Sequence, residues 1–426
     1  MNKIYNPKRE DWKNVFRRPT QTVADIEGLV NTIFEEVKTS GDSILKKYTQ
    51  EFDKVTLENM LVSDVEIEKA KALVSNDLKS AIQLAKSNIE VFHKAQKTGR
   101  VAVETARGVS CWQEKRPIQK VGLYIPGGTA PLFSTILMLA VPATIAGCSE
   151  IVLCSPPDKE GQLNPAILYT ANLCGVTKII KVGGIQAIAG MTFGTESIPQ
   201  VYKIFGPGNQ FVTVAKQIAT KHGVAIDMPA GPSELLVVAD DTANASFVAS
   251  DLLSQAEHGI DSQVILVSTS KTMINAVEKE VALQLEELPR KEIARQAIAN
   301  SKLIYVEDDQ MAIDLINEYG PEHYIVCVAN EDFYIDNTQN AGSVFIGNYT
   351  PESAGDYASG TNHTLPTNGY AKQYSGVNLD SFMKSMTFQK ITKEGIQNIG
   401  NAVELMAEAE GLQAHKNAIT LRLKSL

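Results

Sequence analysis

The chain has 426 residues, of which 44% are apolar and 21% are charged, and its 40 basic and 49 acidic side chains give a net charge of −9. This length predicts two or three domains, and a chain of this size can fold without disulfides or a structural metal. The negative charge argues against nucleic acids and anionic membranes as main partners, because phosphate binding needs a positive face.

Cysteine usage and the amino-terminal segment bear on the compartment. The five cysteines form no CxxC or other tight framework, which is typical of reduced thiols. The first residues, MNKIYNPKREDWK, lack the apolar core of a secretory signal peptide. We therefore expect a cytoplasmic protein.

Residues 1 to about 118 have a helical pattern, with apolar side chains three and four positions apart and charges between them. We expect residues 1–20 to form a helical arm and the helices to continue over 21–120. His93 falls in this region, and the pattern around it predicts a histidine on an exposed helix surface.

The next stretch, from Lys120 to Glu150, contains 29 residues without a formal charge, a length that could span a membrane. Proline and glycine residues at 126–131, together with Pro142, interrupt it. We therefore predict a buried strand, a Gly-Pro turn and a buried helix rather than a membrane span.

From residue 120 onward, short apolar runs alternate with helical segments in two sets. The first set comprises 121–126, 150–157, 178–184 and 201–208, and the second comprises 234–240, 263–269, 302–308, 324–330 and 343–348. Such runs are typical of parallel sheets covered on both faces. We predict two α/β domains with Rossmann-like but incomplete parallel sheets, flanked by helical extensions, the second over 377–426.

Strands of the first set end in Gly or Pro, and polar side chains stand at or just after these ends. These are Tyr124 in YIPGG, Gln186 in GGIQA and Asn209 in GPGN. In open parallel sheets, helix N-termini at such ends offer backbone donors to ligands. None of these motifs is the GxGxxG fingerprint, so a nucleotide site and simple tight turns both remain open.

Four of the six histidines fall in polar motifs of the C-terminal half. The motifs are SQAEHG with Gln255 and His258, PEH with Glu322 and His323, ESAGDYASGTNH with Asp356 and His363, and EGLQAH with Glu410 and His415. Gln255 and His258 would share one helix face. Imidazole nitrogens with carboxylate and amide oxygens suit Zn²⁺ or Mn²⁺. Taken singly, each motif also fits a hydrogen-bonded surface pair or a capped turn.

Three further observations concern catalysis. Glu322 beside His323 is an acid–base candidate, because histidine exchanges protons near neutral pH and a carboxylate can activate water. Ser233 in AGPSE either belongs to a turn or presents its hydroxyl to a ligand. A catalytic cysteine, as in aldehyde-processing dehydrogenases, is disfavoured because Cys148 and Cys154 flank an apolar strand, Cys174 ends a helix and Cys327 lies within a strand.

Taken in order, these motifs make the chain similar to histidinol dehydrogenases over residues 20 to 424. The resemblance rests on VGLYIPGGTAPLFSTILMLAVPATIAGC, FGPGNQFVTVAK, DMPAGPSELLVVAD, DLLSQAEHGIDSQ, PEH, GDYASGTNHTLPT and EGLQAHKNAI. It implies a zinc- and NAD-dependent enzyme that oxidises L-histidinol to L-histidine through histidinaldehyde with two NAD⁺, at the end of histidine biosynthesis. One departure is YIVCV after PEH, where a leucine and an acidic residue are expected.

The resemblance also implies roles for the motif residues. The metal ligands would be Gln255, His258, Asp356 and His415, and Glu322 and His323 would be the catalytic pair. The substrate site would comprise Ser233, His323, His363 and Glu410 with the metal ligands, and the NAD contacts would be Tyr124, Gln186 and Asn209. Glu410 and His415 would serve the partner subunit of a homodimer. Residues 121–232 would bind NAD, and residues 21–120 with 233–376 would bind substrate and metal.

Three other functions compete with this assignment. A relative on the same scaffold could oxidise another small polar alcohol, although His363, Glu410 and the complete ligand set favour histidinol. A zinc hydrolase could also use such a site, and nicotinamide dependence separates the two. A non-catalytic metal-binding protein would have no use for the Glu322–His323 pair.

Overall fold

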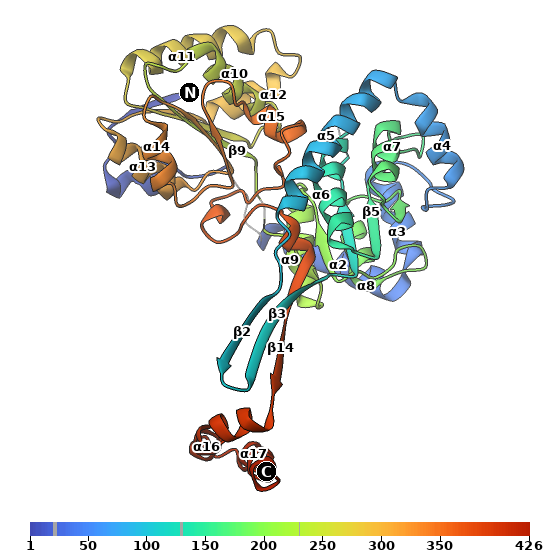
Figure 1. Ribbon diagram of the computed structural model, residues 1–426. Coiled ribbons are helices and arrows are strands. Elements are labelled where there is room, and N and C mark those ends of the chain that lie inside the picture. Colours follow the sequence, from blue (N-terminus) through green and yellow to red (C-terminus); the bar gives the residue numbers. More distant parts are fainter. Residues whose placement is uncertain (20–23, 128–130, 230) are drawn as a thin grey trace.

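The computed structural model describes residues 1–19, 24–127, 131–229 and 231–426 (Figure 1). Residues 128–130 of the expected Gly-Pro turn and Ala230 of the AGPSE motif lie outside the described residues. Two lobes, each built on a parallel sheet with helices on both faces, stand beside one another, and a narrow arm extends away from them (Figure 1). This arrangement confirms the predicted α/β class.

The first lobe contains a five-stranded parallel sheet in the order β6-β5-β4-β7-β8. Its strands are β4 (Lys120–Tyr124), β5 (Glu150–Cys154), β6 (Lys178–Ile180), β7 (Lys203–Phe205) and β8 (Ala225–Ile226). The connecting helices are α6 (Phe133–Ala146), α7 (Pro165–Leu173), α8 (Gly184–Phe193) and α9 (Gln210–Lys221). The predicted apolar runs form the first four strands. The fifth strand was not predicted, because two residues carry no periodic signal.

Alternate residues of these strands face opposite sides of the sheet, and each side has its own core. Val152 and Ile204 pack with α2 (Ala24–Ser40), α3 (Asp42–Tyr48), α8 and α9. Leu123 and Leu153 pack with α4 (Asp64–Leu73), α5 (Asn76–Ala95), α6 and α7. The expected division of the chain is therefore wrong for α2 to α5, which cover the five-stranded sheet instead of joining residues 233–376. Amphipathic spacing shows that a helix has a buried face, but not which sheet covers it.

The second lobe contains a six-stranded parallel sheet in the order β1-β11-β10-β9-β12-β13. Its strands are β1 (Asn2–Tyr5), β9 (Glu234–Ala239), β10 (Gln263–Ser268), β11 (Lys302–Tyr305), β12 (His323–Cys327) and β13 (Ser343–Ile346). Its helices are α10 (Ala245–Ala256), α11 (Lys271–Leu285), α12 (Lys291–Ala299), α13 (Asp309–Tyr319), α14 (Glu331–Asn337) and α15 (Glu352–Tyr357). The five predicted strands of the second set are all present.

The amino terminus is not the helical arm that we expected for residues 1–20. Asn2–Tyr5 is the edge strand β1 and pairs with β11, whose unpaired backbone groups it satisfies. Only two short helical turns follow, η1 (Arg9–Asp11) and α1 (Trp12–Val15). Trp12 and Phe16 then pack into the core beneath the six-stranded sheet, so this segment belongs to the second lobe.

The arm corrects two further expectations. β2 (Val101–Ala106) and β3 (Val109–Pro117) form a hairpin in the region predicted to be helical, and β14 (Met383–Ile391) adds to it from the C-terminal extension. Trp112 and Phe388 stack across the strands with ring centroids 5.3 Å apart, which stabilises this small antiparallel sheet. Beyond β14, α16 (Lys393–Ala409) and α17 (Gln413–Lys424) pack against each other at the tip (Figure 1).

The uncharged stretch after Lys120 forms the buried strand β4 and the buried helix α6, as predicted. Within the described residues, no helix is long and apolar enough to cross a membrane. The prediction for His93 was wrong, because its side chain is fully buried. Its Nδ1 lies 2.8 Å from the carbonyl oxygen of Ile89, and its Nε2 lies 3.4 Å from the side-chain nitrogen of Asn362.

Candidate active site

Two neighbouring pockets lie where the carboxyl ends of β4 to β7 meet the amino ends of β9 and β12. The larger pocket has a volume of about 820 Å³, and the smaller pocket has a volume of about 180 Å³. The turn between β7 and α9 separates them, since Gly206, Pro207 and Gly208 line the smaller pocket and Asn209 lines the larger one. A ligand in either pocket therefore approaches the other across this turn.

The larger pocket contains two of the three side chains expected to contact a nucleotide. Tyr124 lines it, and the Tyr124 hydroxyl accepts a hydrogen bond from the Gly184 N–H at 3.1 Å. Asn209 also lines it and caps α9 by accepting from the Val212 N–H. Gln186 lies just behind the wall in the first turn of α8, fully buried, and both polar atoms of its amide lack a hydrogen-bond partner among the described residues.

Helix N-termini offer backbone N–H donors to the larger pocket, whose charged lining residues are Asp53 and Asp158. Residues at the N-termini of three helices line it, namely Asn164 before α7 and Pro165 within it, Gly184 and Ile185 of α8, and Asn209 before α9. Within the described part of the chain, its lining includes no lysine or arginine. An anionic group bound here would therefore be held by helix N-termini rather than by side-chain cations.

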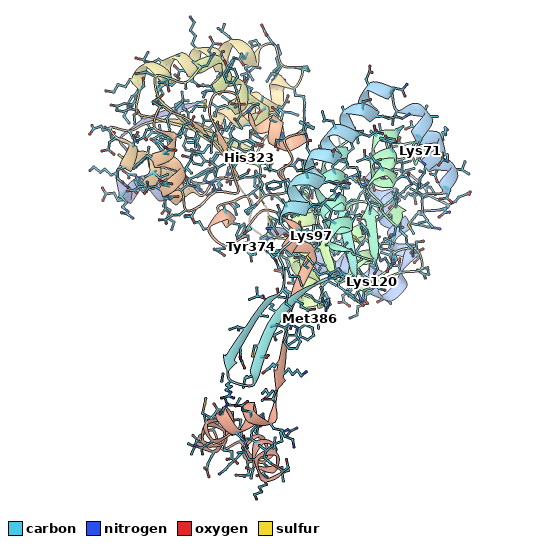
Figure 2. All side chains as sticks on the ribbon, viewed as in Figure 1. Lys71, Lys97, Lys120, His323, Tyr374 and Met386 are labelled. Carbon is cyan, nitrogen blue, oxygen red and sulfur yellow. The ribbon has the colours of Figure 1, made fainter. Side chains whose placement is uncertain are left out.

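The Glu322–His323 pair lies in the smaller pocket at the amino end of β12, and Figure 2 shows His323 inside the second lobe. Both side chains are buried, and Glu322 Oε2 lies 3.7 Å from His323 Nδ1. The backbone of Glu234 holds both residues: its N–H donates to Glu322 Oε2 at 2.8 Å, and its carbonyl oxygen lies 3.2 Å from His323 Nδ1. Nδ1–H donating to that oxygen makes Nε2, which lies 3.5 Å from Asp356 Oδ1, the nitrogen that can exchange a proton with a substrate.

Buried carboxylates dominate the electrostatics of the smaller pocket. Burial raises the pKa of Glu322 to about 8. Burial would lower the pKa of His323, but the carboxylates of Glu352, Glu322 and Asp356 outweigh it and raise this pKa well above its usual range. A pocket with this surplus of negative charge is suited to a bound cation.

His258, Glu352 and Asp356 form a cluster that could hold a metal ion, because each offers a ligand atom within 4.8 Å of the others. Gln255 lines the same pocket, is fully buried, and has no hydrogen-bond partner for its amide among the described residues. α10 ends at Ala256, so His258 lies in the following turn rather than on the helix face that we expected. These nitrogen and oxygen donors fit a divalent ion such as Zn²⁺.

Glu352 was missed by the reasoning from sequence. It lies four residues before Asp356 on α15, so one helix face presents both carboxylates. The ESAGD spacing carried this signal. One Glu352 oxygen is 3.8 Å from His323 Nδ1, and the other is buried without a partner among the described residues.

Two of the remaining predicted substrate residues also line the smaller pocket. Ser233 stands at the entrance to β9. His363 is held from both sides, with Nε2 3.2 Å from the Thr135 hydroxyl of the first lobe and Nδ1 2.9 Å from the Asp356 carbonyl oxygen. Both lobes therefore position His363.

Glu410 and His415 are not brought to the smaller pocket of their own chain. Glu410 directly follows α16 and His415 lies in the first turn of α17, and both are exposed at the tip of the arm (Figure 1). Cysteines do not line either pocket in the described parts of the chain. Burial raises the pKa of Cys174 and of Cys327 to about 12, which keeps both as thiols.

Comparison with known proteins gives one family over almost the whole chain. Residues 16–423 match the family model described as histidinol dehydrogenase. Histidinol dehydrogenase of Bacteroides thetaiotaomicron is 58% identical over 100% of both chains, and that of Escherichia coli K12 is 52% identical over 98% of this chain and 96% of its own. The crystal structure of histidinol dehydrogenase from Elizabethkingia anophelis superposes with a TM-score of 0.98 at 58% identity, covering 100% of this chain and 98% of that one.

A more distant likeness concerns the fold alone. An acetylating aldehyde dehydrogenase from Geobacillus thermoglucosidasius has a TM-score of 0.50 at 12% identity, over 89% of this chain and 94% of that chain. At such identity the likeness carries the two-lobed α/β architecture and no residue roles.

Proposed function

The chain belongs to the histidinol dehydrogenase family of oxidoreductases in histidine biosynthesis, and on this premise we propose a zinc-dependent, four-electron oxidation of L-histidinol to L-histidine by two NAD⁺. The observation that carries the proposal is a buried acid–base pair in a small pocket beside a larger one with three helix N-termini. Histidinaldehyde is the intermediate, and it stays in the smaller pocket between the two oxidations.

NAD⁺ is assigned to the larger pocket, where Tyr124, Gln186 and Asn209 are its proposed contacts. The helix N-termini suit its pyrophosphate, and the volume of about 820 Å³ lies within the usual range for ligand pockets. Bound there, the nicotinamide supplies the hydride acceptor. Only the turn at Gly206 to Asn209 lies between the two pockets, so a nicotinamide at the edge of the larger pocket would lie beside a substrate in the smaller one, and hydride transfer requires this proximity.

The metal is assigned to Gln255, His258 and Asp356 of one subunit with His415 of the other, and Glu352 lies against this set. The unpartnered buried amide of Gln255 and the clustered donors of His258 and Asp356 support the assignment. A divalent ion held there supplies a fixed positive charge that orients the imidazole and amino groups of histidinol.

The protein's own residues carry the protons in this scheme. Nε2 of His323 takes the hydroxyl proton as the carbon-bound hydrogen leaves as hydride, which gives the aldehyde. Glu322 then takes a proton from water as its oxygen adds to the aldehyde carbon. Protonated His323 returns its proton to the aldehyde oxygen, which completes the hydrate and restores His323 as a base. His323 takes a hydroxyl proton from the hydrate during the second hydride loss, which leaves the carboxylic acid of histidine. This acid ionises to the carboxylate, and His323 and Glu322 release their protons to solvent. No thiol intermediate is needed.

A homodimer completes the proposed site. Glu410 and His415 stand exposed on an arm that leaves the body of its own subunit, which suits residues that reach into a second copy. On this proposal Glu410 contacts the substrate of the partner, together with Ser233 and His363 of the subunit that binds it.

The test is the NADH yield from a limiting amount of L-histidinol with excess NAD⁺ and zinc. About two NADH per histidinol would support one protein performing both oxidations. One NADH would mean that the aldehyde escapes, which contradicts the water-activating role of Glu322. No NADH would direct the search to other polar alcohols on this scaffold and then to hydrolysis.

A further inference from the structure

We propose that Arg18 is a positioning residue for the acid–base pair and that it acts through Glu234. This inference rests on the proposed roles of Glu322 and His323. Glu234 is the first residue of β9, which lies between β10 and β12 in the six-stranded sheet. The side chain of Glu234 contacts Arg18, and its backbone contacts the catalytic pair. Glu234 therefore connects Arg18 to Glu322 and His323.

The backbone of Glu234 binds both catalytic side chains, as described above. Its N–H fixes one oxygen of Glu322, and its carbonyl oxygen fixes the imidazole of His323 through Nδ1. A rotation of Glu234 would therefore displace both Glu322, the proposed base for water, and His323, the proposed base for the substrate hydroxyl. It would also change which nitrogen of His323 carries the proton.

The side chain of Glu234 is held by a two-point contact with Arg18. Nε of Arg18 donates to Oε1, and Nη2 donates to Oε2 at 2.9 Å. Only 1% of the Glu234 side chain and 14% of the Arg18 side chain are exposed. The N–H of Asn368 also donates to Oε1, at 2.8 Å. Two parallel hydrogen bonds fix both the position and the plane of the carboxylate.

Arg18 is itself held in place. Its Nη2 donates to the carbonyl oxygen of Tyr319 at 2.9 Å, and its guanidinium lies 4.1 Å from the centre of the Tyr319 ring. The Tyr319 hydroxyl donates to Gln263 in turn, and the Gln263 amide donates to the carbonyl oxygen of Arg17. The segment before α2 is thereby fastened to the end of β9 that carries the catalytic contacts.

Charge gives Arg18 a second effect on the pair. Without a cation nearby, the buried carboxylate of Glu234 would lie unpaired close to that of Glu322, and the two would repel. Arg18 neutralises Glu234, so Glu234 can occupy this position without disturbing Glu322. A lysine would keep the charge but not the two-point geometry, and this difference separates the two effects.

The test uses the full-length enzyme, with Arg18→Lys as the main variant and Arg295→Lys as its matched control. Arg295 pairs with Glu286 and Glu292 on an exposed surface, so its loss should not change turnover. We expect Arg18→Lys to lower kcat for both oxidations at least tenfold, since misplacement by about 1 Å can cost roughly 100-fold. The KM for NAD⁺ should stay within twofold of the wild type, because Arg18 does not line the larger pocket.

A second, double variant keeps the test possible if Arg18→Lys does not fold. Arg18→Met combined with Glu234→Gln removes both charges, so no buried charge is left unpaired, and it should show the same loss of kcat with an unchanged KM for NAD⁺. Wild-type kcat in either folded variant would overturn the inference. A loss of kcat in these variants that is fully accounted for by their loss of folded protein would also overturn it.

A double-mutant cycle with Glu322→Gln separates this inference from the proposed function. Because Arg18 acts through His323 as well as Glu322, adding Arg18→Lys to Glu322→Gln should still lower the rate of aldehyde oxidation, but by a smaller factor than Arg18→Lys lowers it in the wild type. Full additivity would overturn the inference and leave the role of Glu322 standing. A Glu322→Gln enzyme with normal aldehyde oxidation would instead overturn the role of Glu322, and the positioning inference with it.

Discussion

Gly206 packs so closely against Tyr124 that a Cβ atom on Gly206 would lie 2.1 Å from the Tyr124 carbonyl oxygen. Gly206 also has a φ of +127°, which disfavours any residue with a side chain. A buried ion pair clamps the same residue, because Lys216 donates to the Gly206 carbonyl oxygen and Asp227 accepts from its N–H, both at 2.8 Å. Gly206 is therefore held by hydrogen bonds at both its N–H and its carbonyl oxygen, and the wall between the two pockets needs glycine at this position.

Gly206→Ala should consequently damage both stability and cofactor binding. We expect a loss of on the order of 3 kcal/mol in the free energy of unfolding, because the backbone must move to relieve the clash. The KM for NAD⁺ should rise at least tenfold, since Tyr124 lines the larger pocket. Gly223→Ala is the matched control: its φ is also positive, but its Cβ would meet nothing within 4 Å. Equal losses in both variants, measured by urea unfolding and steady-state kinetics, would contradict the steric argument.

Glu322→Gln should slow aldehyde oxidation far more than alcohol oxidation, because only the second step consumes water. General-base catalysis typically contributes 100-fold or more, so we expect about a 100-fold loss in the aldehyde step. Single-turnover measurements starting from histidinol and from histidinaldehyde would separate the two steps. Equal loss in both half-reactions would remove Glu322 from the water-activating role.

His258→Asn should weaken metal binding. Loss of a residue that hydrogen-bonds to a metal ligand already lowers metal affinity roughly 10–100-fold. Loss of a ligand itself should therefore lower it by more than about 100-fold. Zinc content after gel filtration, measured by atomic absorption, would show the change. His222→Asn is the control, because His222 stacks on Phe34 away from both pockets. Full zinc content and normal substrate affinity in His258→Asn would exclude His258 as a ligand.

Asp53 lines the larger pocket, and its raised pKa predicts that the stability of the protein depends on pH. Burial raises the pKa of Asp53 to about 6, and its Oδ2 has no partner among the described residues. A carboxyl group whose pKa is raised by folding binds its proton more tightly in the folded state. Its ionised form therefore lowers stability above pH 6, and that stability returns as the pH falls from 6 towards 4.

Asp53→Asn should thus be more stable than the wild type at pH 8, by about 1 kcal/mol after allowance for partial solvent exposure. The difference should shrink to roughly a third of this value near pH 4.5, as measured by urea unfolding at both values. Glu51→Gln, an exposed neighbour, serves as the control. A stabilisation of Asp53→Asn that is equal at both pH values would show that the carboxyl group does not titrate as described.

The alternation of buried strands and helices was readable from the sequence because its signal is local. Nine apolar runs predicted nine of the strands in the two parallel sheets, and the polar residues at the carboxyl ends of β4 and β7 line the larger pocket. The allocation of α2 to α5, the edge strand β1 and the burial of His93 were not readable. Each depends on contacts between distant segments, which spacing along the chain does not encode.

The smaller pocket illustrates the same limit. Ligands of open parallel sheets usually bind at carboxyl ends, yet Glu322, His323 and Ser233 stand at the amino ends of β12 and β9. Their motifs drew attention to them, and the resemblance to a family gave them roles. Glu352 had only a helical spacing to Asp356, and Arg18 had no local signal at all, because its partner lies 216 residues away.

The position of Glu410 and His415 on the arm predicts that two inactive variants, His258→Asn and His415→Asn, can restore activity when they are mixed. If His415 and Glu410 complete the site of the partner subunit, then His258→Asn and His415→Asn damage different halves of a shared site. A dimer formed from one subunit of each kind has one site with both defects and one site with neither. Random reassociation of equal amounts gives half mixed dimers, each with half of its sites intact, so about a quarter of the wild-type activity should return.

Mixing His258→Asn with Asp356→Asn is the control, because both residues come from the body of one subunit and each site in a mixed dimer keeps one defect. If His415 instead served its own subunit, the first mixture would remain as inactive as the second.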